Sequence, residues 1–325
     1  MRRLLLTAPL AATALLLTAC GTTEPAATEA KESAETITLT DASGTKVELD
    51  GPARNVVGTE WNVVETLISL GVEPVGVADV KGYKTWNTAV PLTNEPKDIG
   101  TRGEPSMDTI ASLKPDLIVA TGDLQPNAVK QLREVAPVLT VTSADASDQM
   151  GQILENVDLV AKATGTTEQA ATLKKDFDAK LAEGRKALAD AGLDGSEIAF
   201  ADGYVTSNQV SVRPYTSGSL IGAVNERLGL KNAWTMEGDK AYGLAATDVE
   251  GLTGLGKDVQ FAYIGSDGDA NSDPFGNQLA KNSVWKSLPF VKAGAVHRLP
   301  DGIWMFGGPG SMGAYTDAVV EALTK

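Results

Sequence analysis

One long helical stretch divides this 325-residue chain into two parts, and each part alternates short apolar runs with segments of helical period. The stretch begins at Thr166, which has the spacing of a capping box with Gln169. About 25 residues at 1.5 Å each extend for roughly 38 Å, enough to run along one side of a domain. This order predicts an α/β fold of two Rossmann-like lobes joined by one long α-helix, with a ligand cleft between the lobes.

The first lobe is predicted to begin with a β-hairpin. Residues 37–40 and 46–49 carry the strand pattern, and the turn residues 41–44 separate them. Apolar strands and amphipathic helices then alternate, which is typical of a mainly parallel sheet. The expected segments are 56–58, 63–70, 74–77, 110–113, 117–120, 126–135 and 138–141.

The N-terminal residues have the character of an export signal. Arg2 and Arg3 precede an apolar run that Pro9 interrupts and that is too short to span a membrane as a helix. The run ends in Leu17-Thr18-Ala19-Cys20, which has the form of a lipobox, and Cys20 is the only cysteine. We expect cleavage before Cys20, and membership of the bacterial lipoproteins would imply a lipid on it that anchors the protein at the extracytoplasmic face of the cell membrane.

Composition excludes several functions. With Cys20 modified and His297 as the only histidine, the chain lacks the ligands of a zinc or manganese importer. Without Arg2 and Arg3, 26 basic and 42 acidic residues give a net charge of −16, which disfavours nucleic acid as a partner. Hydrolase, phosphate-loop and metalloprotease motifs are absent from the sequence, so we expect no catalytic residue, no metal site and no cofactor.

The predicted organisation has five parts. A short internal match supports two lobes, because the segment 105–116 recurs at a constant offset of 142 as 247–258, once on each side of the long helix. The parts are a lipoprotein signal peptide 1–19, a flexible tether 20–36, an N-terminal lobe 37–145, a connecting helical region 146–192 that contains the long helix, and a C-terminal lobe 193–325.

Four residues in segments expected to be loops are the main candidates for ligand binding: Arg102, Trp86, Tyr242 and Trp304. Open α/β sheets bind ligands at the carboxyl ends of their strands, where these loops are expected. Flat aromatic surface together with one guanidinium suits a bulky organic ligand with negatively charged or carbonyl oxygens.

At these residues the sequence resembles the siderophore- and cobalamin-binding proteins of ABC transporters, and among them the ferric-hydroxamate binding proteins. The resemblance covers about Ile37 to Leu323. It is carried by the segments 60–72, 76–79, 98–105 (DIGTRGEP), 113–118 (LKPDLI), 228–234 (LGLKNAW) and 285–294 (WKSLPFVKAG).

The resemblance implies roles for individual residues. Arg102 matches the arginine that bonds the hydroxamate oxygens around the ferric ion, and Trp86 and Trp304 match aromatic positions of the cleft. Three positions depart from the family pattern: Tyr242 replaces a common tryptophan, Phe306 a tyrosine, and Leu124 stands where a second ligand-bonding tyrosine is expected. Further candidates for ligand contact are Trp61, Tyr83 and Phe306, together with Arg213 and Tyr215, which we expect in a loop of the second lobe.

The family also implies a docking role for one carboxylate on each lobe. Asp108 and Glu250 occupy those positions and lie in the repeated segment, and Glu104 is the competing candidate in the first lobe. The alternative interpretation is two solvated acids favoured by a helix dipole. The expected partners are an ABC transporter permease, a ferric siderophore and the membrane, with the protein acting as a monomer.

The sequence therefore predicts an extracytoplasmic solute-binding protein that captures a ferric siderophore, of the hydroxamate type, and delivers it to a permease. The siderophore would supply all the iron ligands. Alternatives are a binder of cobalamin, haem or a catecholate siderophore, a surface enzyme, and a surface interaction module. The number of cationic residues in the cleft separates hydroxamate from catecholate binding.

Overall fold

The computed structural model describes residues 36–207 and 209–325. The predicted signal peptide, Cys20 and all of the tether up to residue 35 lie outside the described residues. The fold begins with the predicted hairpin, in which β1 (Ile37–Thr40) pairs antiparallel with β2 (Lys46–Leu49). The carboxylate of Asp41 fixes its turn by accepting hydrogen bonds from the backbone N–H groups of Ser43 and Thr45.

The N-terminal lobe is built on a five-stranded parallel sheet of order β5-β4-β3-β6-β7. Alternate residues of its strands face opposite layers: Val56 packs with α1 and α5, whereas Val57 packs with α3 and α4. The elements are β3 (Val56–Gly58), α1 (Trp61–Ser69), β4 (Gly76–Val77), α2 (Val80–Trp86), β5 (Lys97–Asp98), α3 (Met107–Leu113), β6 (Leu117–Thr121), α4 (Pro126–Val135) and β7 (Val138–Val141).

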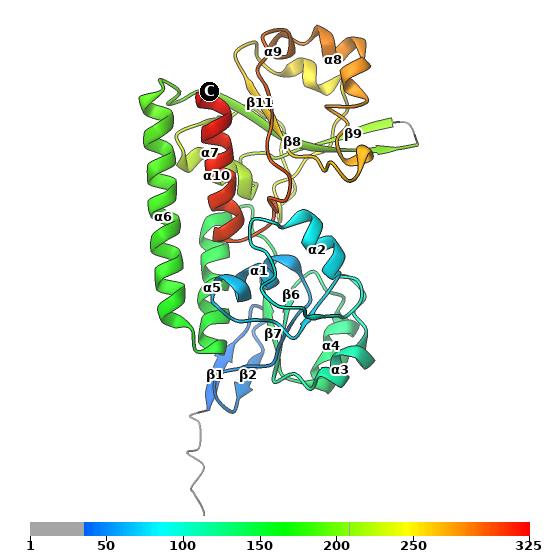
Figure 1. Cartoon of the computed structure of the whole chain (residues 1–325), viewed down its shortest axis with the longest axis vertical. Helices are drawn as coiled ribbons and strands as arrows, with labels where there is room; N and C mark the ends of the chain where they lie inside the picture. Colours follow the sequence, from blue (N-terminus) through cyan, green and yellow to red (C-terminus); the bar gives the residue numbers. More distant parts are fainter. Residues whose placement is uncertain (1–35, 208) are drawn as a thin grey trace, which may run out of the picture. The chain divides into compact units, whose positions relative to one another are not determined.

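Two helices follow, α5 (Gln149–Thr164) and α6 (Thr167–Asp190). The 24 residues of α6 form the predicted long helix, and Figure 1 shows it beside the C-terminal helix α10 (Pro309–Thr324). The predicted capping box is wrong. The hydroxyl of Thr166 bonds the hydroxyl of Thr164 and makes no capping hydrogen bond to the start of α6.

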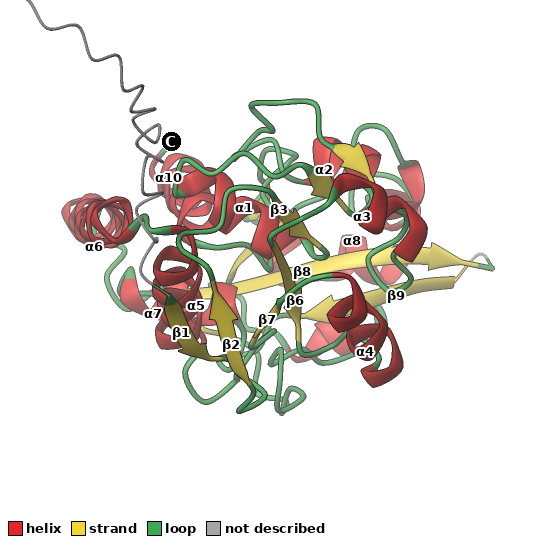
Figure 2. Ribbon diagram, turned by 90° about the horizontal axis from the view of Figure 1, so that it is seen from below, coloured by secondary structure: helices red, strands yellow, loops and turns green. Residues whose placement is uncertain are grey.

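The C-terminal lobe has a second sheet, in which β10, β8, β11 and β12 are parallel and β9 pairs antiparallel with β8. In Figure 2 the long strand β8 extends outward together with β9. The prediction that Arg213 lies in a loop is wrong, because β9 carries it. The elements are β8 (Glu197–Thr206), β9 (Gln209–Pro214), α7 (Leu220–Arg227), β10 (Lys231–Asn232), η1 (Gly251–Gly254), β11 (Gln260–Tyr263), η2 (Ala270–Ser272), η3 (Leu279–Lys281), α8 (Ser283–Ser287), α9 (Pro289–Lys292) and β12 (Val296–Arg298).

A buried carboxylate joins the first lobe to the last helix. Glu65 of α1 is fully buried and accepts four hydrogen bonds, from the backbone N–H groups of Gly308 and Ser311, the Ser311 hydroxyl and the Asn87 amide. Burial raises the pKa of Glu65, and these hydrogen bonds oppose the rise. A carboxylate at a helix N-terminus is stabilised by the unpaired N–H groups there.

The segment between β12 and α10, residues 299–308, is held against the N-terminal lobe; we call it the crossing segment. The carbonyl of Gly302 accepts hydrogen bonds from the backbone N–H groups of Thr88 and Ala89. Gly302 has a φ of +77°, and a Cβ atom there would lie 2.0 Å from the Thr88 hydroxyl oxygen, so the close approach needs glycine. The side chains of this segment therefore pack with residues of the first lobe.

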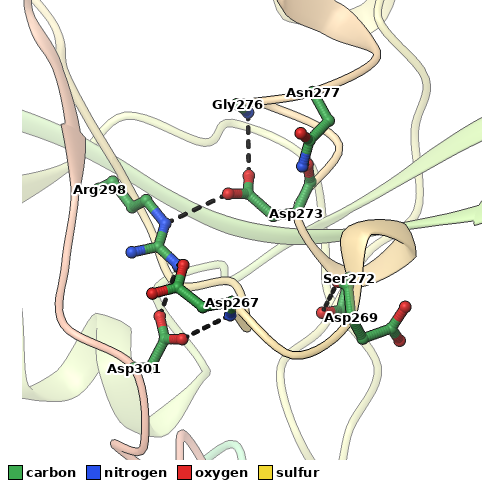
Figure 3. A network of polar contacts seen from close by, with 8 residues as sticks. All are labelled: Asp267, Asp269, Ser272, Asp273, Gly276, Asn277, Arg298 and Asp301. Atoms are coloured by element: carbon green, nitrogen blue, oxygen red, sulfur yellow. Dashed lines mark hydrogen bonds and ion pairs between the residues drawn. The ribbon is translucent and has the colours of Figure 1, made fainter.

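Figure 3 shows the polar network at the start of the crossing segment. Arg298 of β12 forms ion pairs with Asp267, Asp273 and Asp301, at N–O distances of 2.6, 3.2 and 2.6 Å. The positive charge of the guanidinium thus offsets part of the negative charge of these three aspartates. Within residues 36–207 and 209–325, no group of three or more His, Cys, Asp or Glu residues could hold a metal ion.

The part of the chain that the structure describes contains no helix long and apolar enough to span a membrane.

Candidate functional site

A cavity of about 300 Å³ lies between residues of both lobes and the crossing segment. The first lobe contributes one loop and the start of α1, and the second lobe contributes the β8–β9 hairpin and a loop after β10. The cavity is lined by Glu60, Asn62, Arg102, Tyr204, Arg213, Tyr242, Leu244, Trp304 and Phe306. The structure therefore brings together the predicted residues Arg102, Arg213, Tyr242, Trp304 and Phe306.

Arg102 stands on the loop between β5 and α3, as predicted. Its Nη1 atom donates a hydrogen bond to Oε1 of Glu60 over 2.7 Å, and Glu60 is the N-cap residue of α1. The guanidinium carbon lies 4.1 Å from the ring centroid of Trp61 and 5.4 Å from that of Trp304. With 36% of its side chain exposed, Arg102 is oriented by its neighbours and still reaches the solvent of the cleft.

Arg213 brings a second guanidinium to the cleft, whereas the four main candidates predicted from the sequence include only one, that of Arg102. Its Nε and Nη2 atoms donate to the two carboxylate oxygens of Asp202, the residue opposite it in the β8–β9 register. Nη2 also donates to the hydroxyl of Tyr204 over 3.0 Å. Asp202 is only 4% exposed, so this bidentate pair fixes the position of the Arg213 guanidinium from its buried side.

Aromatic rings line the cavity beside the two arginines. The ring centroids of Trp304 and Phe306 are 5.1 Å apart, and Trp304 lies 4.7 Å from Trp61 of the first lobe. Tyr242 meets Phe306 edge to face at 5.5 Å. These contacts form a continuous aromatic wall on which a bulky ligand can pack.

Tyr242 also connects the two lobes. Its hydroxyl donates a hydrogen bond to Asp123, which follows β6 in the first lobe. Burial raises the pKa of Tyr242, and the hydrogen bond and negative charge of Asp123 raise it further, so the phenol stays protonated.

Two polar atoms of the lining lack a hydrogen-bond partner among the described residues. They are Nε1 of Trp304, a donor, and Oδ1 of Asn62, an acceptor. Buried polar atoms are normally paired, so each could bond a ligand or a water molecule in the cleft.

Several predicted site residues lie elsewhere. Trp86 ends helix α2 instead of standing in a loop, and it packs at the edge of the apolar cluster around Trp61. Tyr83 is fully buried in that cluster and donates its hydroxyl to the carbonyl of Val90. Tyr215 is buried beneath Arg213, and Leu124 belongs to the core of the first lobe.

His297 lies on strand β12 of the C-terminal lobe. Its Nε2 atom is 2.8 Å from the side-chain oxygen of Gln260, and burial lowers its pKa.

Four residues of the lining were not predicted from the sequence: Glu60, Asn62, Tyr204 and Leu244. A hairpin prediction for residues 197–214 would have found Tyr204, because it would have set Asp202 opposite Arg213 and Tyr204 one alternation further along the same strand. Glu60 had a weaker signal, since an N-cap acid before an apolar helix is ordinary.

The repeated segments also match in local structure. Ser106 and Asp248, 142 residues apart, each accept a hydrogen bond from the backbone N–H three residues later. Asp108 and Glu250 each lie two residues after these hydrogen-bond acceptors and are exposed. Neither carboxylate makes a hydrogen bond or ion pair with another described residue.

Comparison with known proteins decides the family. The model of the periplasmic binding protein family matches residues 56–302, most of the chain. The chain belongs to this family. In this periplasmic binding protein, the match begins at the first strand of the parallel sheet and ends within the crossing segment.

Two curated relatives from Bacillus subtilis (strain 168) are similar along most of their length. YfiY, named as a probable siderophore-binding lipoprotein, is 26% identical over 303 residues, covering 90% of this chain and 89% of YfiY. YfmC, an Fe(3+)-citrate-binding protein, is 28% identical over 282 residues, covering 84% and 81%. Their names differ in ligand chemistry, so they do not fix the ligand of this periplasmic binding protein.

Among solved structures, the fold is similar to the siderophore-binding protein FhuD from Vibrio cholerae, crystallised with Fe3+-Desferal. The TM-score is 0.75 at 26% sequence identity, and the alignment covers 83% of this chain and 98% of FhuD. The two-lobe fold with a long connecting helix is therefore confirmed.

Proposed function

We propose that this periplasmic binding protein captures a ferric siderophore of the hydroxamate type and delivers it to an ABC transporter permease. One observation carries the proposal: two guanidinium groups, one from each lobe, flank a cavity with an aromatic wall. The relatives support the same class, since YfiY is named as a siderophore-binding lipoprotein and FhuD was crystallised with Fe3+-Desferal.

The residues of the cleft suit a ligand whose iron is already coordinated. Arg102 has N–H groups beyond the one bonded to Glu60, and these can donate to hydroxamate or carbonyl oxygens of the siderophore. The organic shell can pack on Trp304, Phe306 and Tyr242. The protein then contacts only the organic shell of the siderophore complex and supplies no ligand to the iron.

The number of cationic residues favours hydroxamate over catecholate. The described residues of the cavity lining include Arg102 and Arg213 but no lysine or histidine. A tris-catecholate complex carries a high negative charge and calls for more cations than this, because each unpaired charge in a partly desolvated cleft is costly.

A fluorescence titration of the purified protein tests the proposal. We expect ferrichrome, a ferric hydroxamate, to quench the tryptophan emission of the protein in a saturable manner, since Trp304 lines the cavity. Haem, cobalamin and a ferric catecholate serve as competing ligands at equal concentration. Saturable binding of one of these, with no response to any ferric hydroxamate, would contradict the hydroxamate proposal.

Docking on the permease is proposed for Asp108 and Glu250. Both carboxylates are exposed, lack an ion-pair partner among the described residues and stand at equivalent positions of the repeated segment. Reversal of both charges to lysine should leave siderophore affinity unchanged and reduce uptake in cells. Normal uptake by the double variant would instead favour Glu104 or a docking surface elsewhere.

Lipid anchoring on Cys20 is proposed from the lipobox Leu17-Thr18-Ala19-Cys20. The relative YfiY is itself named as a lipoprotein, which supports this proposal. Mass spectrometry of the native protein should find a lipidated Cys20 as the first residue of the mature chain, at the extracytoplasmic face of the membrane. Cys20→Ala should release the protein and leave ligand binding intact, whereas an unmodified N-terminus in the native protein would overturn the proposal.

A further inference from the structure

We propose that Glu60 and Asp202 set the charge selectivity of the cleft, so that it accepts a ferric complex without net charge and disfavours a polyanionic one. Each carboxylate is bonded to one of the two cleft arginines. The inference rests on the proposed function and concerns the charge of the ligand at the same site.

On the side of the second lobe, the charge of Arg213 is cancelled from within the protein. Asp202 is 4% exposed, accepts two hydrogen bonds from the guanidinium and is also within reach of the hydroxyls of Tyr204 and Tyr215, at 3.4 and 3.3 Å. A buried carboxylate with this many donors is fixed in place and stays beside Arg213 when a ligand enters.

On the side of the first lobe, Glu60 does the same for Arg102. Its Oε1 atom accepts from Nη1 of Arg102 over 2.7 Å and from the backbone N–H of Trp61 over 2.9 Å. The second bond holds the carboxylate at the start of α1, so a ligand that approaches Arg102 also meets the negative charge of Glu60.

Both arginines nevertheless keep N–H groups for a ligand. Nη2 and Nε of Arg102, and Nη1 of Arg213, have no hydrogen-bond partner within the described part of the chain. The cleft therefore offers charge-assisted donors, but Arg102 and Arg213 are balanced by Glu60 and Asp202. Such a site hydrogen-bonds oxygens well and attracts net negative charge weakly.

The balance of two arginines and two carboxylates distinguishes siderophore classes by the net charge of their ferric complexes. Three hydroxamates each lose one proton on binding Fe³⁺, and the complex is neutral. Three catecholates each lose two protons and leave a trianion. Two fixed carboxylates next to the donor groups repel a trianion and leave the electrostatic energy of a neutral complex nearly unchanged.

The test compares affinities for ferrichrome, which is neutral, and ferric enterobactin, which is a trianion. Glu60→Gln keeps an oxygen that can accept from Arg102 and removes the charge, and Asp202→Asn does the same beside Arg213. We expect the affinity for ferric enterobactin relative to ferrichrome to rise about tenfold in Glu60→Gln and further in the double variant. High salt should shrink the change, because screening weakens charge effects.

Glu95→Gln is the matched control, because it removes an exposed carboxylate that does not line the cavity and should leave the ratio unchanged. Thermal denaturation checks that each variant is folded; if Asp202→Asn unfolds, Glu60→Gln alone decides. An unchanged ratio in a folded Glu60→Gln that binds ferrichrome would overturn the inference and leave the proposed function standing. If the wild-type protein binds neither complex, the proposed function itself fails.

Discussion

The two arginines of the cleft are held in different ways, although each has a carboxylate partner. Arg102 stands on a loop, has a single hydrogen bond to Glu60 and packs on the face of Trp61. Arg213 stands on a strand, forms a bidentate pair with a buried aspartate and also bonds a tyrosine hydroxyl. The partner of Arg102 is 23% exposed in its side chain, whereas that of Arg213 is 5% exposed.

This difference separates two tasks. Arg213 is held by buried groups of the second lobe. The position of its guanidinium therefore depends on the folding of that lobe. Arg102 lies at the surface of the first lobe and keeps more donors free. We infer that Arg213 shapes the cleft and Arg102 makes the adjustable contacts with the ligand.

The largest effect is expected from Arg213→Ala. The substitution leaves the buried Asp202 without its charge partner, which should destabilise the ligand-free protein by about 3 kcal/mol. Thermal or urea denaturation measures the loss, and the double variant Arg213→Ala with Asp202→Ala should recover part of it. A melting temperature equal to that of the wild type would show that the pair has no structural role.

Arg102→Ala should weaken siderophore binding without loss of stability. It removes a charge-assisted hydrogen bond to the ligand, worth about 1.5–3 kcal/mol, which corresponds to roughly ten- to a hundredfold in Kd. Glu60 remains solvated in the variant, so the melting temperature of the ligand-free protein should change little.

Arg102→Lys is the sharper companion variant. An ammonium group cannot reproduce the planar arrangement of guanidinium donors or its stacking on Trp61, so it should recover only part of the lost affinity. Full affinity in Arg102→Ala for every ferric siderophore that the wild type binds would remove Arg102 from the site and contradict the division of tasks between the two arginines.

Tyr242→Phe should have the smallest effect. It deletes the hydroxyl that bonds Asp123 and keeps the ring against Phe306. Because Asp123 is exposed and can bond water instead, the cost should be at most about 1 kcal/mol, or less than about fivefold in Kd. The titration used for Arg102 measures it, and a much larger loss would mean that this link between the lobes is needed to form the binding site.

The sequence predicted the parts of the fold that depend on local pattern. The residues of β7 and α4, Val138–Val141 and Pro126–Val135, were predicted with the bounds that the structure has, because their apolar periodicity and the flanking prolines are read directly from the chain. The long helix α6 was predicted for the same reason, although the capping box at Thr166 was wrong.

The site was harder to predict, since it depends on contacts between distant segments. Arg213 was predicted to lie in a loop, and strand β9 was not recognised. Its partner Asp202 places a buried charge in β8 and so breaks the apolar pattern of that strand. Trp86 ends a helix that starts from Asp79 in a left-handed conformation, a start that no simple pattern indicates. Tyr83 is an aromatic residue next to a glycine, and only tertiary packing decides that it is buried.

The hydrogen bonds to Glu65 have a consequence for the order in which the protein matures. Those donated by Gly308 and Ser311 join residues 243 and 246 positions apart, and the crossing segment that supplies Trp304 and Phe306 lies between the last strand and the last helix. Contacts between residues so far apart require most of the chain to be available. A ribosome or an export channel that has released only the first 300 residues therefore holds a protein without an aromatic wall. We therefore expect ligand capture to begin only when the end of the chain has emerged and folded back onto the first lobe.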